Sequence, residues 1–578
     1  MAGPTAPKDP EKARPFFYIL KDKDIFGERQ KDGTGIQFIY ESDGRLINSA
    51  QITGNVTDKE ELRLLETVEG FGRLVHSIGV SVETDRPEET AEFVFQMYGK
   101  KDLYGGGTNL TTSLKCDGME HRIYLSDYRW TEDDHVPGQI KILFAAPERM
   151  GKVSVRLFLN DGYEAPPEEE DLVIDMHSEE YCGMISRSLL QLGNPYRIRK
   201  AIEKSKAGKE VTLAYIGGSI TQGAGAIPIH TECYAYKSFQ LFQNRFSTQN
   251  NVRFIKAGVG GTPSELGMIR FDRDVLREGE RPDIVVIEFA VNDEGDETKG
   301  VCYESLVRKV LKLPWKPAVV LLFSVFANDW NLQERLRPVG DLYDLPMVSI
   351  RDAVTPQFSL KCGEGRILSK NQFFYDIFHP NNTGHTIMAD CLQYLFERCD
   401  AAEPARVGTF VEGMTEEQIL SEKLFGPAVI GADFERIFLL DKKNRYVGAK
   451  IRAGGFASTD MELQSVEMDG NLTQTPEFPY NWMYDGSRPQ MPGFEMEITC
   501  KSLFLIFKDS GEMDVGKANV FVNDVYCMTA DPHKNNWLHC NAVLLFWETE
   551  SRSHKVRIAV TEEDRNKKFT ILGFGYTI

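Results

Sequence analysis

The sequence predicts an α/β domain in the middle of the chain, with a jelly-roll-like β-sandwich domain on each side of it. The chain has 578 residues, of which 42% are hydrophobic, so it is long enough to form several domains with buried cores. Short runs of alternating polar and apolar residues fill the first and last parts of the chain, whereas continuous runs of β-branched or apolar residues, separated by amphipathic segments, fill the middle. We therefore expect three domains, at residues 1–180, 181–404 and 405–578.

The first domain is expected to consist of strands joined by tight turns. Between residues 16 and 166, the segments GIQFIYES, HRIYLSDY, GQIKILFAA and KVSVRLFLN alternate in character and are separated by DG, GGG and PG pieces. This pattern is typical of a β-sandwich. The acidic stretch APPEEEDLVIDMHSEE then begins a linker, and residues 184–206 have the periodicity of a helix.

The middle domain is expected to contain a parallel sheet covered by helices on both faces. Its apolar runs are VTLAYI, VRFIKA, DIVVIEFAV, AVVLLFSVF and PMVSI, and amphipathic segments such as YESLVRKVLKL alternate with them. Strands that are apolar on both faces and alternate with helices are typical of this arrangement. After residue 405, a short helical piece at residues 415–423 precedes strand-and-turn sequence such as SLFLIFKDSG and KFTILGFGYTI, which predicts a second β-sandwich without helices between its strands.

The composition excludes several classes of partner. The formal net charge is −19, and because nucleic acids and anionic membrane surfaces bind clustered Lys and Arg, we expect neither as a partner. No apolar run reaches the length of a membrane helix, and the charged, proline-containing N-terminus lacks the apolar core of a secretion signal. The ten cysteines form no C-x-x-C pair. We therefore expect a cytoplasmic protein that acts on a neutral or weakly charged substrate.

Four short segments place glycine or polar residues after predicted strands or before a helix. Ser219 follows two glycines after the first central strand, and a Gly-Gly pair at residues 260–261 follows the second. Asn292 follows the third strand, and Asp376 and His379 lie three residues apart on a turn before a predicted helix. The carboxyl ends of parallel strands meet at one edge of a sheet, where α/β proteins build their sites. There the Asp376 carboxylate can hold one imidazole nitrogen of His379 and leave the other for the Ser219 hydroxyl.

This ordered set of segments resembles the four sequence blocks of the SGNH, or GDSL-like, hydrolase superfamily, and the resemblance covers the central third of the chain. It implies a flavodoxin-like, three-layer α/β/α domain. It also implies that Ser219 is the nucleophile and that Asp376 and His379 complete a catalytic triad. By the same resemblance, the oxyanion hole would consist of the Ser219 amide, Gly261 and Asn292, and neither a cofactor nor a metal would take part.

Three positions depart from the usual blocks of the superfamily. Gly218 stands where Asp is usual, Lys256 where Asn is common, and Ala290 where Gly is common. None of these changes removes a group that takes or gives a proton or charge in the expected mechanism, so they concern the subfamily rather than catalysis. The G-x-S-x-G motif of ordinary α/β-hydrolases is absent around Ser219, which favours the SGNH frame.

Three other residues are weaker candidates for a catalytic role. His385, six residues after His379, could be the base, but we interpret it as a helix residue that packs near the site. Asp293 could be the acid in place of Asp376, but we interpret it as a residue that caps or braces its loop. His230 is interpreted as a loop residue. No H-E-x-x-H motif or acidic metal cluster occurs in the sequence, so a metal-dependent esterase has little support.

The flanking domains indicate the class of substrate. Two β-sandwich-like regions around an SGNH core resemble multidomain carbohydrate esterases, which implies removal of O-acetyl groups from hemicellulose-type oligosaccharides such as acetylated mannan, xylan or xyloglucan. Trp330, Trp482 and Tyr484 each lie among polar residues and could stack on sugar rings. The alternative for Trp482 and Tyr484 is that they are core or interface aromatics. Two alternatives stay open, an SGNH esterase for a lipid or thioester and a non-catalytic glycan-binding protein. The flanking domains could also supply the surfaces of a homodimer.

Overall fold

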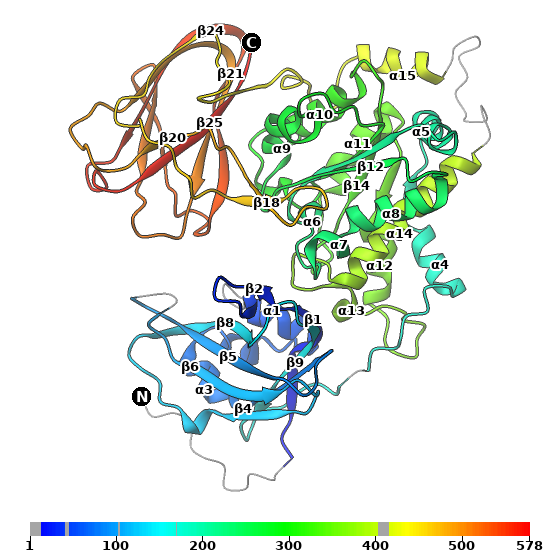
Figure 1. Cartoon of the computed structure of the whole chain (residues 1–578), viewed down its shortest axis with the longest axis vertical. Coiled ribbons are helices and arrows are strands. Elements are labelled where there is room, and N and C mark those ends of the chain that lie inside the picture. Colours follow the sequence, from blue (N-terminus) through cyan, green and yellow to red (C-terminus); the bar gives the residue numbers. More distant parts are fainter. Residues whose placement is uncertain (1–12, 41–44, 102–104, 169, 403–415) are drawn as a thin grey trace.

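The computed structural model describes residues 13–40, 45–101, 105–168, 170–402 and 416–578, and the observations below concern these ranges. A β-rich N-terminal region, a central α/β region and a β-rich C-terminal region follow one another along the chain (Figure 1). No helix in the described ranges is long and apolar enough to span a membrane.

Two antiparallel sheets form most of the N-terminal region. One has the strand order β1-β9-β4-β7 and the other β2-β3-β8-β5-β6. The strands are β1 (Phe16–Phe26), β2 (Glu28–Arg29), β3 (Gly35–Tyr40), β4 (Val75–Thr84), β5 (Thr90–Gly99), β6 (Asn109–Lys115), β7 (His121–Tyr124), β8 (Asp134–Phe144) and β9 (Met150–Leu159). Buried side chains of both sheets, such as Ile78 and Phe93, belong to one hydrophobic core.

Short helices that the alternating pattern does not predict interrupt this region. They are α1 (Arg45–Thr53), α2 (Lys59–Leu64) and α3 (Val68–Leu74). The local signals of α2 and α3 are N-terminal caps, because the side chains of Asp58 and Thr67 accept backbone hydrogen bonds from the first turns of these helices. Phe71 of α3 is fully buried and stacks on Phe95 with 5.4 Å between the ring centroids. The N-terminal region is therefore not purely β, and α3 fills part of its core.

The segment that leads into the central sheet is not one continuous helix. Its helices α4 (Glu179–Ser186) and α5 (Tyr196–Lys206) are separated by the edge strand β10 (Leu189–Gln191). Gly193 has a φ of +55° and Pro195 precedes α5, and neither residue suits the interior of a helix. The helical periodicity predicted over residues 184–206 therefore holds only at the two ends of that range.

The central sheet has the strand order β12-β11-β13-β14-β15-β10. Its remaining strands are β11 (Val211–Gly217), β12 (Val252–Gly258), β13 (Ile284–Glu288), β14 (Ala318–Phe323) and β15 (Met347–Ser349). These five strands are parallel and lie in the order 2-1-3-4-5, which is the flavodoxin-like order, while β10 pairs antiparallel with β15 at the edge. The predicted α/β fold of the central region is confirmed.

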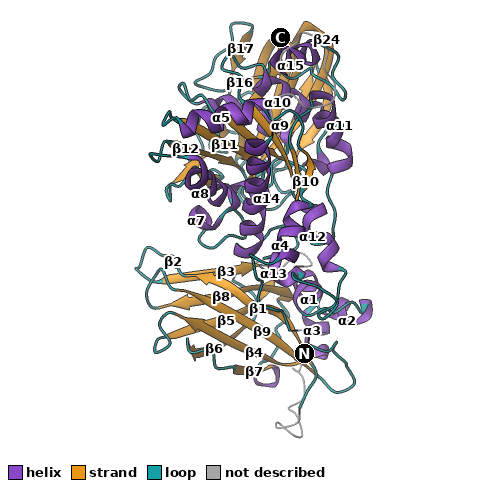
Figure 2. Ribbon diagram, turned by 90° about the vertical axis from the view of Figure 1, so that its right-hand side faces the viewer, coloured by secondary structure: helices purple, strands orange, loops and turns teal. Residues whose placement is uncertain are grey.

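Helices cover both faces of this sheet (Figure 2). One face carries α5, α8 (Tyr234–Phe246), α12 (Ile350–Phe358) and α14 (Asn382–Ala401), and the other carries α9 (Ser264–Phe271), α10 (Val301–Leu311) and α11 (Gln333–Tyr343). Along β11, Leu213 and Tyr215 face the first group of helices, whereas Ala214 and Ile216 face the second. Because both faces of β11 are buried, all of its residues are buried and Thr212 is the one polar side chain among them.

Shorter helical elements connect these layers. They are α6 (Ser219–Gln222), α7 (Ile229–Glu232), α13 (Lys370–Phe373), a 3-10 turn at Asp293–Gly295 and a π-helical turn at Asp272–Leu276. Another 3-10 turn, at Leu125–Asp127, lies in the N-terminal region after β7. Both α6 and α13 lie close to the carboxyl edge of the central sheet, where the candidate site is found.

After α15 (Glu416–Phe425), the C-terminal region consists of strands. An antiparallel sheet follows the path β16-β25-β21-β24-β22-β23, with β17 joined to β21 and β20 joined to β25, and β18 and β19 form a separate hairpin. The strands are β16 (Phe438–Leu440), β17 (Ala449–Arg452), β18 (Ser465–Glu467), β19 (Gln474–Pro476), β20 (Trp482–Tyr484), β21 (Phe494–Asp509), β22 (Ala518–Val522), β23 (Val525–Ala530), β24 (His539–Val560) and β25 (Phe569–Thr577). Residues 426–578, all of them described, contain no helix, as predicted. Ile506 and Leu572 share a core with Leu266 of α9, so this region packs directly on the central helices.

Candidate active site

Ser219 lies at the carboxyl end of β11 and is the first residue of α6. The two glycines before it have no room for side chains. A Cβ on Gly218 would lie 2.2 Å from Asn292 Oδ1, and a Cβ on Gly217 would lie 2.2 Å from Thr221 Oγ1. The glycines let the chain turn from the strand directly into α6. A helix of 4 residues has no periodicity, so the sequence pattern does not show where α6 begins.

Asp376 and His379 lie on the turn that follows α13, and the structure brings them to Ser219. His379 Nε2 is 3.0 Å from Ser219 Oγ, and His379 Nδ1 is 2.9 Å from Asp376 Oδ2. Asp376 Oδ1 also accepts hydrogen bonds from the backbone N–H groups of Phe378 and His379, at 2.8 and 2.9 Å. These backbone bonds fix the carboxylate, and its bond to Nδ1–H leaves Nε2 as the acceptor for the serine proton.

N–H groups are arranged beside the serine. As the first residue of α6, Ser219 has a backbone N–H with no carbonyl partner inside that helix. Gly260 lies close, since a Cβ on it would be 3.8 Å from Ser219 Cβ, but its N–H already donates to Gln222 Oε1 at 2.9 Å. Gly261, the next residue, is exposed and has a φ of +70°. The Asn292 amide packs against the backbone just before Ser219, so the three expected oxyanion groups lie at the same edge of the sheet.

Beneath α6 lies a chain of buried polar groups. Thr221 Oγ1 donates to Glu288 Oε2 at 3.1 Å and lies 2.8 Å from the hydroxyl of Tyr234. The Tyr234 N–H donates to His385 Nδ1, and His385 Nε2–H donates to the carbonyl of Ala224, each at 3.1 Å. Burial raises the pKa of Glu288 to about 7 and lowers the pKa of His385 to about 3. His385 is therefore a neutral residue with both ring nitrogens engaged, as its packing interpretation predicts, and it is not placed to act as the base.

Asp293 and His230, the other two weaker candidates, also have contacts unlike those of a catalytic acid or base. Asp293 Oδ1 accepts a hydrogen bond from the N–H of Ser264, the first residue of α9, at 2.7 Å, so Asp293 braces its loop as predicted. Burial and the neighbouring Asp296 raise the pKa of Asp293 to about 8. His230 lies in the short helix α7 rather than in a loop, and burial lowers the pKa of its imidazole. Within the described ranges, no cluster of three His, Cys, Asp or Glu side chains could hold a metal ion.

The C-terminal region contacts the loop that contains Gly260 and Gly261. Gln464 Nε2–H donates to the carbonyl of Gly260, and His539 Nε2–H donates to the carbonyl of Gly261, each at 2.9 Å. The Trp537 ring lies beside the same loop, because a Cβ on Gly261 would come within 2.8 Å of Trp537 Cζ2. Trp537 is 45% exposed and packs on His539 with 4.6 Å between the ring centroids. Their position beside the site depends on packing between regions distant in sequence, so no local pattern indicates these residues.

Trp330 belongs to a series of ring contacts that leads to His379. Its ring stacks on Phe326 with 5.8 Å between the centroids, and Phe326 contacts Phe378 edge-on at 5.1 Å. Phe378 precedes His379 and is 39% exposed. A half-buried indole and an exposed phenyl ring therefore lie close to the candidate base.

The expectation that Trp482 and Tyr484 contact substrate is wrong. Their exposed fractions are only 5% and 6%, and both side chains belong to the hydrophobic core of the C-terminal sheet. Trp482 packs edge-on against Phe494 with 5.4 Å between the centroids, and the Tyr484 hydroxyl donates to the carbonyl of Arg565. Both residues lie on β20, and alternation within so short a strand does not tell whether its aromatic face points to the core or to solvent.

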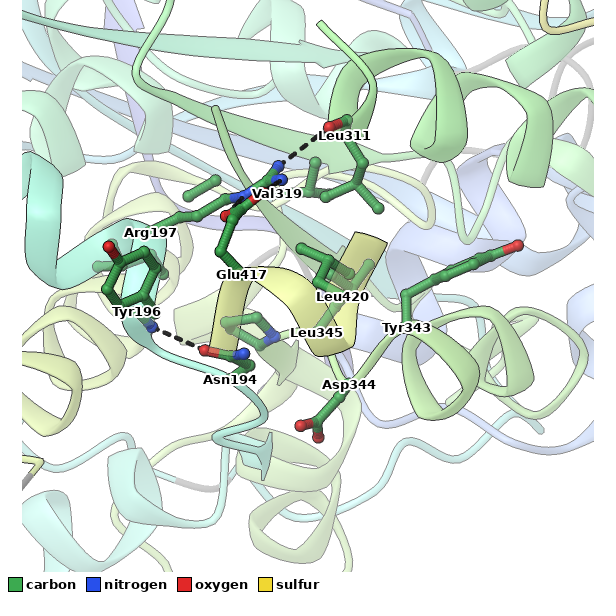
Figure 3. A pocket seen from close by; sticks show the side chains of 13 residues that line it. Asn194, Tyr196, Arg197, Leu311, Val319, Tyr343, Asp344, Leu345, Glu417 and Leu420 are labelled. Atoms are coloured by element: carbon green, nitrogen blue, oxygen red, sulfur yellow. Dashed lines mark hydrogen bonds and ion pairs between the residues drawn. The ribbon is translucent and has the colours of Figure 1, made fainter. Parts of the chain in front are cut away.

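A separate pocket lies at the amino-terminal ends of β14 and β15, at the opposite edge of the sheet (Figure 3). Tyr196, Leu311 and Leu420 line it, together with Arg197 and Glu417. Arg197 donates two hydrogen bonds to the Glu417 carboxylate, at 3.1 and 2.8 Å. These two charges pair with each other, and neither Ser219 nor His379 lines this pocket, so the chemistry is assigned to the Ser219 edge.

Comparisons with a family model and with solved structures found similar proteins. Residues 215–387 match the model of the GDSL-like Lipase/Acylhydrolase family. No curated protein sequence matches the chain. Among solved structures, a two-domain esterase active on acetylated mannans is similar, with 24% identity and a TM-score of 0.55 over 68% of this chain and 98% of that one. The same kind of esterase co-crystallized with mannopentaose gives 23% identity and a TM-score of 0.53 over the same shares. These likenesses show a shared fold.

Proposed function

We propose that this chain, a carboxylic ester hydrolase whose central region is a GDSL-like lipase/acylhydrolase domain, removes O-acetyl groups from hemicellulose-type oligosaccharides through a Ser-His-Asp triad. The observation that carries this proposal is the hydrogen-bonded line from Ser219 Oγ through His379 to Asp376, with distances of 3.0 and 2.9 Å. This geometry is that of an activated serine nucleophile.

In the proposed reaction, Ser219 Oγ attacks the acetyl carbonyl carbon while His379 Nε2 takes the hydroxyl proton. Asp376 stabilises the imidazolium that forms. The imidazolium then gives its proton to the departing sugar oxygen, and the acetyl group remains on Ser219. Water that is deprotonated by His379 attacks this ester, releases acetate and restores the free serine.

Negative charge develops on the carbonyl oxygen in both halves of the reaction. The Ser219 and Gly261 N–H groups and the Asn292 amide are the donors proposed for it. Removal of one such donor typically raises the barrier by about 2.7–4 kcal/mol. Because the Gly260 N–H is bonded to Gln222, Gly261 rather than Gly260 is the glycine that can serve.

An acetylated oligosaccharide fits the surroundings of the serine. Trp330 and Phe378 lie on the His379 side, and the partly exposed Trp537 lies on the Gly261 side. Aromatic faces stack on the C–H faces of sugar rings, so the two indoles could bind residues on either side of the acetylated one. The net charge of −19 is also compatible with an uncharged substrate. The similar two-domain esterase is active on acetylated mannans, which supports the same class of substrate here.

The test is acetate release from acetylated mannan, xylan and xyloglucan oligosaccharides, compared with hydrolysis of long-chain acyl esters and thioesters. We expect acetate from at least one oligosaccharide and little reaction with the long-chain esters. Ser219→Ala should lower the rate by about 10⁴-fold or more. Ser186→Ala, at an exposed position on α4, is the matched control and should be fully active.

Faster hydrolysis of a long-chain ester or thioester would instead favour the lipid or thioester class. Oligosaccharide binding without any acetate release would favour a non-catalytic glycan-binding protein. Full activity of Ser219→Ala would refute the proposed triad.

A further inference from the structure

The N-terminal region contacts the segment that carries the triad acid and base. α1 and β1 lie next to α13, which leads into that segment (Figure 1). Asn371 Nδ2–H donates to the carbonyl of Lys21 at 3.4 Å, and Gln372 Nε2–H donates to the carbonyl of Leu172 at 2.7 Å. A region that is remote in sequence therefore supports the base of the Asp376–His379 turn.

One backbone group at the base of this turn needs a donor from outside it. Phe374 and Pro380 face each other as an antiparallel bridge, and the hydrogen bonds that close the turn run between the neighbours of this pair, at 2.8 Å each. In a pair that exchanges no hydrogen bonds, each carbonyl points away from the partner strand. Phe374 is completely buried. Its carbonyl would therefore lack a partner unless another segment supplied one.

Lys23 of β1 supplies that partner. Its Nζ donates a hydrogen bond to the carbonyl of Phe374 and lies 5.9 Å from the centroid of the Tyr375 ring. β1 has a bulge between Leu20 and Lys23, in which Asp22 has a φ of +51°. A bulge of this kind redirects the side chains that follow it. Here it directs Lys23 across the boundary between the two regions.

The ammonium group of Lys23 loses most of its hydration shell because the side chain is buried. Lys23 is only 3% exposed, and an apolar side chain of similar volume would be buried there without losing a hydration shell. A charged donor to a carbonyl forms a stronger hydrogen bond than a neutral one. The lysine at this position therefore gives the Phe374 carbonyl a stronger hydrogen bond than a neutral side chain would. Phe374 lies two residues before Asp376.

We infer that Lys23 is a positioning residue for the triad, which holds the Asp376–His379 turn in the geometry that reaches Ser219. This inference rests on the proposed function, since it concerns the same site. Lys23 acts through the backbone of Phe374 and takes no part in the chemistry. The N-terminal region is thus required for a competent site and not only for binding or stability.

The test compares Lys23→Met, Lys23→Gln and Lys23→Arg with Lys115→Met, which replaces an exposed lysine on β6 of the same region. We expect Lys23→Met to lower kcat for 4-nitrophenyl acetate at least tenfold with KM within twofold of wild type. Arg should recover most of the loss, and Gln, a shorter neutral donor, should lie between. Lys115→Met should match wild type. If Lys23→Met does not fold, the kcat values of Lys23→Arg and Lys23→Gln still test the inference, because it requires Lys23→Arg to have the higher kcat.

A second readout separates this inference from the proposed function. The rate at which a fluorophosphonate labels Ser219 reports the reactivity of the triad without any sugar or acetyl group. Slower labelling of Lys23→Met than of wild type and Lys115→Met supports the inference, whatever ester proves to be the substrate. Equal labelling and kcat in folded Lys23→Met overturn it while leaving the function intact. Failure of wild type to react with either reagent would overturn the proposed function and, with it, the role of Lys23.

Discussion

Gly261→Ala is the substitution for which the structure gives the most definite expectation. A Cβ at this position would lie 2.8 Å from Trp537 Cζ2 and 2.9 Å from His539 Nε2, closer than a real Cβ approaches other heavy atoms. The φ of +70° adds a left-handed conformation that costs an alanine about 1–2 kcal/mol. The loop must therefore move, and its N–H must move with it.

The size of the effect follows from the role proposed for that N–H. Loss of one oxyanion donor lowers kcat by about 10²–10³-fold, so we expect Gly261→Ala to lose activity in this range. Its free energy of unfolding should fall by about 1–2 kcal/mol from the backbone strain alone. The assays are steady-state hydrolysis of 4-nitrophenyl acetate and denaturant unfolding.

Gly363→Ala is the control for strain without contact. Gly363 has a φ of +87° and nothing within 4 Å of the place of a Cβ. It should lose a similar amount of stability and retain full kcat. If Gly261→Ala keeps its kcat within threefold of wild type while both variants are destabilised alike, the Gly261 N–H does not bind the oxyanion and the reasoning fails.

Two further predictions concern the substrate and the pH dependence of stability. Trp537→Ala should raise KM for an acetylated oligosaccharide about three- to tenfold, which corresponds to the loss of an aromatic contact of about 0.5–1.5 kcal/mol. It should leave 4-nitrophenyl acetate hydrolysis unchanged. The control is Trp547→Ala, at an indole that is 42% exposed, and an equal rise in KM in this variant would contradict a specific role of Trp537. Burial lowers the pKa of His385 from 6.5 to about 3, so the unfolded chain binds the proton first as the pH falls. The His385 contribution to stability is complete above pH 6.5 and is lost progressively toward pH 3; urea unfolding of His385→Gln should show a shallower loss over this interval, and identical slopes would refute this assignment.

The central fold and the close approach of Asp376 and His379 are predictable because their signals are local. Each central strand lies in a run of mainly β-branched or apolar residues, and Asp376 and His379 are three residues apart on one turn. The beginning of α6 at Ser219 was not predictable, since the glycines before it allow a turn without showing where the helix starts. Helices α1 to α3 are not predictable from the pattern, because helices of 9 residues or fewer are too short to show a periodic pattern.

The side chains supplied by the flanking regions were not predictable for a different reason. Trp482 and Trp537 are both tryptophans among polar residues of the C-terminal region, yet the first is 5% exposed and the second 45%. Only the packing of the C-terminal sheet on the central helices decides which of them meets the site. The burial of Lys23 is not predictable from the sequence either, because a lysine in a strand is expected to face solvent.

The two flanking regions act on the site in the same way. Lys23 binds the carbonyl of Phe374, before the acid and base, and His539 binds the carbonyl of Gly261, beside the nucleophile. Both contacts end on backbone oxygens, so they can fix the catalytic loops without altering the chemistry of Ser219. A contact to a backbone carbonyl also places no demand on the side chain of the residue that accepts it, which is why the sequence blocks of the central domain do not reveal such contacts. A chain reduced to residues 181–404 would keep the triad and the Asn292 amide but would lose both donors. Under the proposed function, the central sheet therefore supplies the reacting groups, whereas the regions before and after it supply contacts that hold their loops.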